Sequence, residues 1–272
     1  MNFRVKQWIV AVLSLFFLGS LITVGFIESG RLLPEKKAKV VVTAKNESCV
    51  NCHTEKSPGI VKQWEDSRHA PLGVGCVDCH AAKKGEPDAW EHEGSLIATI
   101  VSPKDCARCH EKVAKEFTDS HHSKAAKFIG SLDNFLGVVV EGAPAAINGC
   151  QKCHGSTVKV LKSGKLDPAT WPNTGVGRIN PDGSNGACTA CHSRHTFSAA
   201  QARQPENCGK CHMGPDHPQI EIYNESKHGI AFRARINEMN LDSKSWIVGK
   251  DYSAAPTCAT CHMSATRDLP IT

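Results

Sequence analysis

The stretch CTACHSRHTFSAAQARQPENCGKCH, residues 188–212, contains the pattern Cys-x-x-Cys-His twice. The pattern occurs five more times in the 272-residue chain, and its copies use all 14 cysteines. Numbered in chain order, the seven motifs are Cys49/Cys52/His53, Cys76/Cys79/His80, Cys106/Cys109/His110, Cys150/Cys153/His154, Cys188/Cys191/His192, Cys208/Cys211/His212 and Cys258/Cys261/His262. A pattern repeated with no cysteine left over organises most of this chain.

The motif has a specific chemical use. Two thiols three positions apart can bond to the two vinyl groups on one edge of a haem, and the adjacent histidine can reach the iron. Thioredoxin-like pairs and zinc ribbons do not require the trailing histidine, and a disulfide framework does not enforce this spacing. The seven copies therefore predict seven covalently bound c-type haems, with the motif histidines as proximal iron ligands.

Composition agrees with a chain built around cofactors. Aromatic residues make up only 6% of the sequence, which is little for a protein core of this size. We expect a mainly α chain with extensive irregular loops, a multihaem cytochrome c fold organised around its haems. The formal net charge of +5 is offset by two propionates on each haem. The charge therefore does not indicate nucleic-acid binding, and no nucleic-acid partner is expected.

The N-terminal segment predicts a membrane anchor. Residues 8–27 contain no charged side chain, and Arg4 and Lys6 precede them. Such a run can span a bilayer with its N-terminus in the cytoplasm. The alternative is a cleaved signal peptide, but no Ala-x-Ala-like site follows. Both interpretations place the haems outside the cytoplasm, in the periplasm. The expected organisation is an N-terminal transmembrane anchor at 1–30, a polar tether at 31–47 and a heptahaem domain at 48–272.

Short helices are expected between the motifs. Apolar residues at helical spacing predict a helix over 111–128, and a second helical pattern lies within 217–239. Ser198 and Gln201 predict a capped helix start. Residues 162–187, rich in Gly, Pro, Asn and Asp, predict a long loop, and no strand pattern is evident.

Two glycines in the long loop, Gly175 and Gly177, are separated by one residue. No strand precedes them, and no third glycine follows in register. They therefore do not predict a nucleotide-binding site.

Each haem iron has a second axial position, and the spare histidines are candidate ligands for it. Half of the 14 histidines lie outside the motifs. Because His121 and His122 are adjacent, at most one of them should serve any single haem. The candidate distal ligands are His69, His92, His121, His122, His195 and His228.

The remaining histidine, His217, follows Asp216 and lies between Pro215 and Pro218. The prolines restrict this loop. A carboxylate beside an imidazole can move protons near neutral pH. It can equally orient a histidine that binds iron. The local sequence leaves both roles open.

Two stretches carry a family resemblance: SRHTFSAAQARQPENCGKCHMGPDHPQIEIYNESKHG at 193–229 and APTCATCHM at 255–263. With seven motifs in order, they resemble the hydroxylamine oxidoreductase family of octahaem cytochromes. Four groups of residues stand at the expected offsets from the motifs. They are Arg194-His195, Pro205-Glu206, Asp216-His217 and Ser226-Lys227-His228-Gly229.

The resemblance implies a catalytic haem at the fourth motif. That haem would have His154 as its proximal ligand and no distal protein ligand, and it would bind a small nitrogen compound. Asp216 and His217 would lie over its iron as catalytic residues. The other haems would carry two histidines each and conduct electrons.

Family members continue to an eighth haem, whereas the seventh motif is the last in this sequence, as in a truncated or split reading frame. Members without a tyrosine cross-linked to the catalytic haem are thought to work reductively. The resemblance thus implies reduction of hydroxylamine, nitrite or nitric oxide, a homo-trimer, and electrons from quinol or another cytochrome. The alternative is a non-catalytic cytochrome that links the quinone pool to a periplasmic reductase.

Overall fold

The structure is a computed structural model that describes residues 8, 12–17, 19–20, 38–127, 149–215, 217–253 and 256–263. The chain divides into two units, 1–39 and 40–272. The second unit begins inside the segment expected to be a tether, and the Val41 N–H donates to Ala70 O at 3.0 Å.

Much of the expected anchor, including residues 21–27, lies outside the described residues. Among the residues that the structure describes, we find no helix with the length and apolar character needed to span a bilayer.

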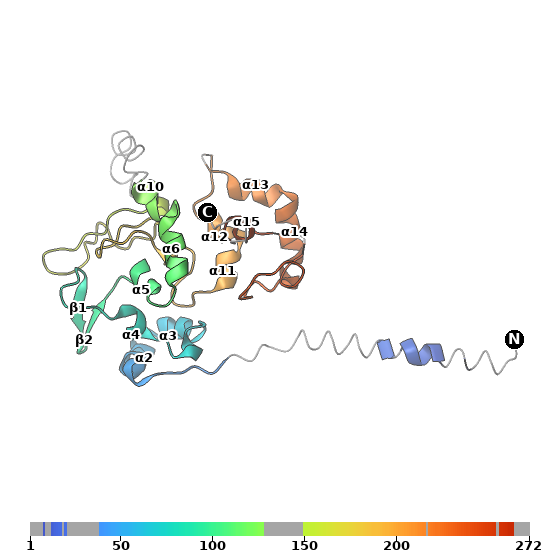
Figure 1. Ribbon diagram of the computed structural model, residues 1–272, viewed down its shortest axis with the longest axis horizontal. Coiled ribbons are helices and arrows are strands. Elements are labelled where there is room, and N and C mark those ends of the chain that lie inside the picture. The colour runs from blue at the N-terminus through green and yellow to red at the C-terminus, as the bar shows by residue number, and fades with distance from the viewer. Residues whose placement is uncertain are drawn as a thin grey trace. The chain divides into compact units, whose positions relative to one another are not determined.

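The described part of the chain consists mostly of short helices joined by irregular segments (Figure 1). This confirms the expected class, mainly α with extensive loops. The elements are α2 (Ala44–Lys56), α3 (Pro58–Glu65), η1 (Ala70–Leu72), α4 (Cys76–His80), β1 (Ala89–His92), β2 (Ser95–Ala98), α5 (Pro103–Ala107), α6 (Glu111–Asp119), η2 (His122–Lys124), α10 (Cys150–His154), η3 (Cys188–Ala190), α11 (Ala199–Arg203), α12 (Pro205–Gly209), α13 (Gln219–Glu225), α14 (Lys227–Arg235), η4 (Ile236–Glu238) and α15 (Cys258–His262).

The prediction of one helix over 111–128 is wrong. Helix α6 ends at Asp119, and Ser120 is extended. The Ser120 hydroxyl donates to Phe117 O at 2.6 Å, and the Ser123 hydroxyl donates to Thr118 O at 2.7 Å. Serine hydroxyls compete with backbone N–H groups for these carbonyls, so the helix stops although the apolar period continues.

The other helix predictions are partly confirmed. Helix α11 begins after Ser198, whose hydroxyl accepts from Gln201 N at 3.1 Å. The pattern within 217–239 forms two main helices, α13 and α14, rather than one. Ser226 separates them and caps α14 by accepting from Gly229 N at 3.2 Å.

A β-hairpin was not expected from the sequence. Strands β1 and β2 pair antiparallel, with Ala89 opposite Ala98 and His92 opposite Ser95. Two residues with positive φ, Glu93 and Gly94, form the turn. Four-residue strands are too short to show alternation clearly, which explains the miss.

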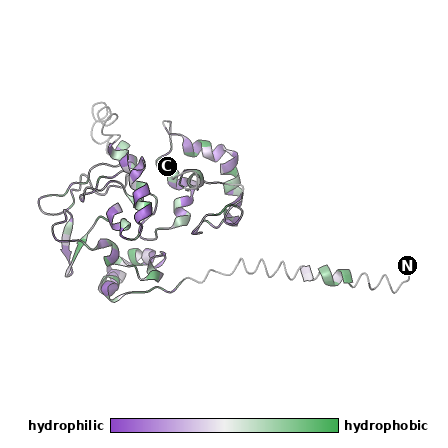
Figure 2. Cartoon of the chain, viewed as in Figure 1, coloured by the Kyte–Doolittle hydropathy of each residue, from purple (hydrophilic) through white to green (hydrophobic). Residues whose placement is uncertain are grey.

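Buried apolar side chains are few in the described residues. One cluster contains Val61, Trp64 and Ala70, with Val40 and Val50 packed against it. Figure 2 shows apolar and polar residues interspersed along most elements. This sparse core agrees with a fold completed by large apolar cofactors.

Candidate functional site

The motifs form compact helical turns. In α4, α10 and α15 the turn coincides with the motif, and the first motif lies within α2. In the third motif, the His110 N–H donates to Cys106 O at 2.8 Å. Helical geometry places positions i and i+3 on one face, so each pair of thiols can meet one haem edge. All 14 cysteines are free of disulfide bonds.

The motif cysteines differ in exposure, which the repeated pattern does not predict. Ten of the 14 are half-buried, as expected of residues that bind a cofactor. The second cysteine of the first, third, sixth and seventh motifs departs from this expectation and is exposed: Cys52, Cys109, Cys211 and Cys261. In these motifs the protein itself does not enclose the second thiol.

Residues beside these exposed cysteines are exposed as well, whereas Cys79 and Cys153, at the same position in α4 and α10, are half-buried. In the seventh motif, Cys261 lies in the last turn of α15, and the adjacent residues His262 and Met263 are exposed as well. Cys52 lies in the second half of α2, where Asn51, Thr54 and Glu55 are also exposed. An exposed thiol remains accessible to a vinyl group, and a haem plate could cover it. Haem attachment through these four thiols therefore stays a prediction.

Four motif histidines lie opposite histidines from elsewhere in the chain. Each pair joins one candidate proximal ligand to one candidate distal ligand, at similar separations. The ring-centroid distances are 6.0 Å for His53–His92, 6.3 Å for His80–His195, 6.2 Å for His110–His69 and 6.1 Å for His212–His122.

These separations fit an iron between the rings. A metal–imidazole bond is about 2.0 Å, and a ring nitrogen lies about 1 Å from its ring centre, so two axial imidazoles have centres about 6 Å apart. Direct ring stacking would instead bring the centres closer. The donor set in each pair therefore suits a haem iron with two histidine ligands.

Hydrogen bonding and burial also suit neutral, iron-binding imidazoles. His80 Nδ1 lies 2.8 Å from Ala98 O, which leaves Nε2 available for a metal. Burial lowers the pKa of His69, His122 and His195, and in each case the opposed motif histidine lowers it further. A metal-binding imidazole nitrogen must be unprotonated, so these surroundings favour the required state.

Thiols of different motifs contact one another in three places. In one of them, the hydrogen bond from Cys208 lowers the pKa of Cys258 to about 7. The hydrogen-bonded pairs are Cys106 with Cys188, Cys153 with Cys211, and Cys208 with Cys258. The fifth motif is thus beside the third, and the sixth is beside both the fourth and the seventh.

Weaker electrostatic contacts complete this order. Cys49 acts on Cys76, and Cys106 acts on Cys79, which relates the second motif to the first and the third. Cys191 acts on Cys211, which relates the fifth motif to the sixth. The motifs therefore adjoin in the order one, two, three, five and six, with the fourth and seventh both next to the sixth.

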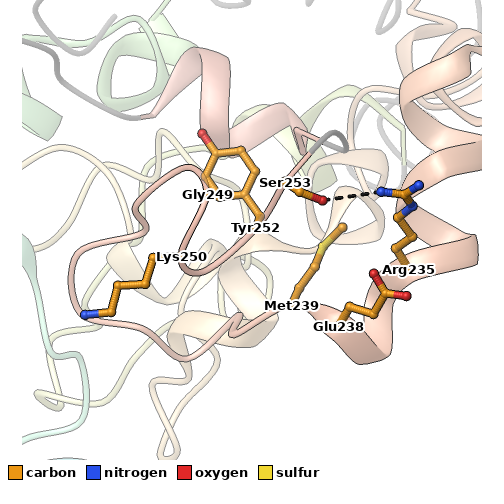
Figure 3. A pocket seen from close by; sticks show the side chains of 7 residues that line it. All are labelled: Arg235, Glu238, Met239, Gly249, Lys250, Tyr252 and Ser253. Carbon is orange, nitrogen blue, oxygen red and sulfur yellow. Dashed lines mark hydrogen bonds between the residues drawn. The ribbon is translucent and has the colours of Figure 1, made fainter.

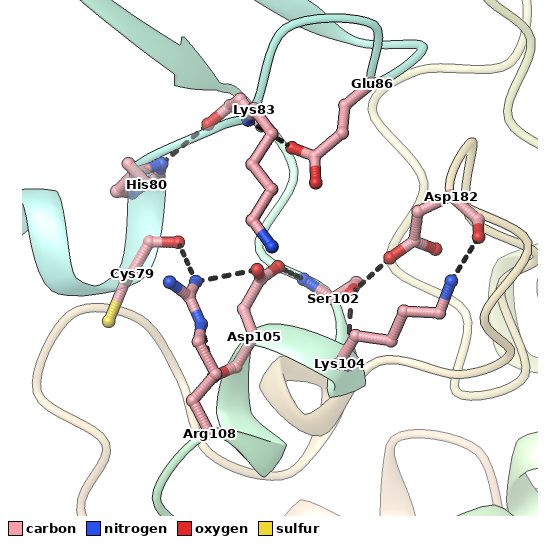
Figure 4. A network of polar contacts seen from close by, with 10 residues as sticks. Cys79, His80, Lys83, Glu86, Ser102, Lys104, Asp105, Arg108 and Asp182 are labelled. Carbon is pink, nitrogen blue, oxygen red and sulfur yellow. Dashed lines mark hydrogen bonds and ion pairs between the residues drawn. The ribbon is translucent and has the colours of Figure 1, made fainter.

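Side chains tie neighbouring motifs together. Arg108, inside the third motif, donates to Cys79 O of the second at 3.3 Å and to Asp105 at 2.7 Å (Figure 4). Asn207, next to the sixth motif, donates to Cys191 O of the fifth at 3.1 Å. These bonds fix the spacing between motifs.

The buried side chain of Asn46 ties the first motif to the second. Its Oδ1 accepts from Val77 N at 2.8 Å, and its Nδ2 donates to Thr43 Oγ1 at 2.8 Å and to Asp78 Oδ2 at 3.3 Å. Helix α2 is therefore held against α4 by a satisfied buried amide.

The two glycines of the long loop support the fourth motif. The backbone N–H groups of Val176 and Gly177 donate to Cys153 O at 2.9 Å and His154 O at 3.1 Å. A Cβ on Gly175 would lie 2.1 Å from the Gly155 nitrogen. Sequence reasoning missed this role, although two glycines so close together signal a close backbone approach.

The same loop is braced by Arg178, which is 2% exposed. Its Nε donates to Asn180 Oδ1 at 2.6 Å, and its guanidinium lies 5.5 Å from the centre of the Trp171 ring. Burial lowers the pKa of Arg178 to about 10, so it remains charged at neutral pH. This buried cation was not identified from the sequence.

The remaining predicted iron ligands and catalytic residues have different surroundings. His121 and His228 are exposed, and neither takes part in such a ring pair among the described residues. His217 is also exposed, and its N–H donates to Gly214 O at 3.2 Å. Asp216 lies outside the described residues, so the geometry of the Asp216–His217 pair stays a prediction.

Comparisons with known proteins agree with the motif geometry. The family model described as seven times multi-haem cytochrome CxxCH matches residues 72–269, and that of cytochrome c554 and c-prime matches 29–81. A probable nitrite reductase-hydroxylamine oxidoreductase fusion protein of Kuenenia stuttgartiensis is 30% identical over 270 residues, covering 85% of this chain. The chain spans 27% of that protein.

Two solved structures are also similar. A hypothetical multiheme protein has a TM-score of 0.75 and 32% identity, with 87% of this chain and 55% of that chain covered. A reducing HAO-like protein complex of Kuenenia stuttgartiensis has a TM-score of 0.58 and 26% identity, with 80% and 42% covered. The family match and the paired histidines lead to one conclusion: the chain belongs to the multihaem cytochromes with repeated CxxCH motifs, which carry covalent c-type haems, and it is similar to hydroxylamine oxidoreductase-like proteins.

Proposed function

We propose that every one of the seven motifs holds a c-type haem and that the protein moves electrons along them. Four paired histidines, His69, His92, His122 and His195, complete the coordination at the third, first, sixth and second motifs. When bound, each haem supplies an iron that accepts and releases one electron. The four ring separations near 6 Å are the observation that carries this proposal.

The number of haems is tested by intact mass spectrometry of the mature protein. The expected mass is that of the mature polypeptide plus seven haems. Cys150→Ala with Cys153→Ala should remove one haem and leave six. A mature protein with fewer haems, unaffected by this variant, would contradict the assignment at the fourth motif.

We further propose that the fourth motif is the place of catalysis, with reduction of nitrite, nitric oxide or hydroxylamine. The motif contact between Cys153 and Cys211 supports this, because it brings the segment after the sixth motif toward the fourth. His154 would hold the iron from one side. The His217 imidazole would give protons to the substrate, and Asp216 would orient that ring. The names of two relatives, a nitrite reductase fusion and a reducing complex, support this chemistry.

Turnover tests the catalytic proposal. Methyl viologen reduced by dithionite serves as electron donor, and ammonium formed from nitrite or hydroxylamine is measured. His217→Ala should lower kcat about 100-fold, the usual size of a general acid–base contribution. Haem reduction by the donor should be unchanged. Equal turnover in both proteins would exclude His217 from the chemistry.

A non-catalytic electron carrier is the second candidate, favoured by the same four histidine pairs. In that case His217 would be an axial ligand. His217→Ala would then shift the potential of one haem, and nitrite would not be consumed by the wild-type protein.

We also propose that residues 8–27 anchor the protein in the membrane, with the motifs in the periplasm and a quinol-linked or other cytochrome as redox partner. The uncharged run after Arg4 and Lys6 supports this. Alkaline carbonate should not extract the full chain from membranes. Release of the protein by carbonate would refute the anchor.

We propose a homo-trimer as well, from the family resemblance. Light scattering of a detergent-solubilised sample tests this oligomeric state.

A further inference from the structure

The loop over residues 240–253 has a fixed shape. At its centre lies Asp251, which is 2% exposed. Its carboxylate accepts from Ile247 N at 2.6 Å and from Asn240 Nδ2 at 3.3 Å, and its carbonyl accepts from Asn240 N at 2.8 Å. A buried carboxylate satisfied by several donors holds both sides of the loop in place.

This loop is bonded directly to the seventh motif. The Trp246 indole N–H donates to Thr260 Oγ1 at 2.9 Å, and Thr260 stands between the two motif cysteines. Trp246 stacks on Tyr252 with ring centres 4.6 Å apart, and the Arg203 guanidinium lies 4.9 Å from the Trp246 ring. A molecule that contacts the loop is therefore close to a haem-binding motif.

The tip of the loop presents apolar side chains to solvent. Ile247 is 46% exposed and Val248 is 65% exposed, and Gly249 turns the chain with φ of 80°. The hydrogen bonds to Asp251 hold this tip in place, so the exposure belongs to an ordered loop. A fixed apolar tip gains stabilising burial only when a partner covers it.

The charges around the tip favour an acidic partner. Lys244 and Lys250 belong to the loop, and Figure 3 shows Lys250 pointing away from Met239 and Arg235. Of the acidic residues here, Asp251 is turned inward, and Asp242 lies 3.9 Å from Arg68. Glu238 is exposed but lines the same cavity as Arg235, which offsets its charge.

A shallow cavity of about 150 Å³ lies beside Tyr252, with Arg235 and Glu238 at its wall (Figure 3). Its volume is enough for one side chain of a partner. An apolar tip, a basic rim and a recess together suit a small protein with an acidic surface.

We propose that the tip of loop 240–253, formed by Lys244, Ile247, Val248 and Lys250, docks an acidic electron-carrier protein beside the seventh motif. The proposal rests on the electron-transfer function proposed above. In each encounter one electron leaves the reduced carrier and reduces one ferric iron of the bound haems. Docking at the tip shortens the distance between the carrier and the seventh motif.

The experiment measures haem reduction in the full holoprotein by stopped-flow spectroscopy. The probe is a reduced plant-type ferredoxin, an acidic iron–sulfur protein. The test variant combines Val248→Thr with Lys250→Glu. The matched control combines Leu161→Thr with Lys162→Glu, because Leu161 is 44% exposed and Lys162 is exposed on another loop. Reduced methyl viologen, a small cation, serves as a donor that needs no docking surface.

The test variant should lower the second-order rate constant with ferredoxin about tenfold at low salt and flatten its dependence on ionic strength. The control variant should stay within about twofold of wild type, and methyl viologen should reduce all three proteins equally. Equal rates with ferredoxin in both variants would overturn the proposal.

A change of oligomeric state in the test variant alone would also overturn the proposal, because the tip would then be an interface between copies of this chain. Failure of methyl viologen to reduce the wild-type haems would instead refute the electron-transfer function itself.

Discussion

The adjacent residues His121 and His122 have different surroundings. The ring of His122 is half-buried and 6.1 Å from that of His212, whereas His121, just before η2, is exposed. The sequence limits the two histidines to one ligand for any single haem but leaves open which of them it is. The backbone conformation between α6 and η2 determines which histidine faces His212, because it turns the two side chains in different directions.

His122→Ala should therefore remove one low-spin haem signal and produce one high-spin signal, because the iron at the sixth motif loses its second imidazole. His121→Ala should leave the spectrum unchanged. Electron paramagnetic resonance of the two oxidised variants makes the comparison. Loss of a low-spin signal in His121→Ala would mean that His121, and not His122, is the iron ligand.

A substitution at Gly175 tests whether the long loop lies close to the backbone of the fourth motif. Gly175→Ala should destabilise the protein by about 2 kcal/mol, because the new methyl group meets the backbone of Gly155 at 2.1 Å. The matched control is Gly59→Ala near the start of α3, where a Cβ would have nothing within 4 Å. Thermal unfolding of both holoproteins measures the effect, and similar midpoints would contradict it.

For the helices and strands, the sequence predicts where a capped helix starts but not where side-chain hydrogen bonds end a helix early. The start of α11 follows from Ser198 and Gln201, which lie three residues apart. The early end of α6 depends on hydroxyl bonds from Ser120 and Ser123, which the apolar period does not reveal. The β-hairpin carries His92 on β1 and supplies the Ala98 carbonyl for His80 from β2. Its turn residues, Glu93 and Gly94, are an uncommon pair for a two-residue hairpin loop.

The hydrogen bonds of Asn46 that hold α2 against α4 can be tested by substitution. Asn46→Ala should lower the free energy of unfolding by about 2 kcal/mol, because Val77 N loses its hydrogen-bond partner at a half-buried position. It should also change the magnetic interaction between the haems of the first two motifs. Ser48→Ala, at an exposed position of the same helix, is the control. An Asn46→Ala protein as stable as the control, with unchanged spectra, would show that the tie is not needed.

For the whole molecule, the sequence establishes the number of motifs but not their order in space. The third motif contacts the fifth through Cys106 and Cys188, and the fourth contacts the sixth through Cys153 and Cys211. These neighbours are not consecutive along the chain. The pairing of His80 with His195 is equally non-local. Such contacts join segments that are far apart in the sequence, and no local pattern predicts them.

The seven proposed haems would thus form a relay that begins at the first motif and divides into two branches at the sixth. The fourth motif ends one branch, where we place the chemistry, and the seventh ends the other branch, where we place partner docking. On this proposal, electrons that arrive at the seventh motif would reach the fourth through the sixth. Loss of the proposed distal ligand at the sixth motif, in His122→Ala, should therefore slow nitrite reduction by ferredoxin. The loss of the corresponding ligand at the first motif, in His92→Ala, should slow it less. Steady-state ammonium formation by the two variants measures this difference.

We propose a set of bis-histidine haems with one open haem at the fourth motif. Electron paramagnetic resonance of the oxidised holoprotein, recorded with and without hydroxylamine or nitrite, distinguishes this arrangement from one without an open haem. We predict several low-spin signals that ignore both compounds and one high-spin signal that changes when either is added. Only low-spin signals, unchanged by both compounds, would contradict the claim.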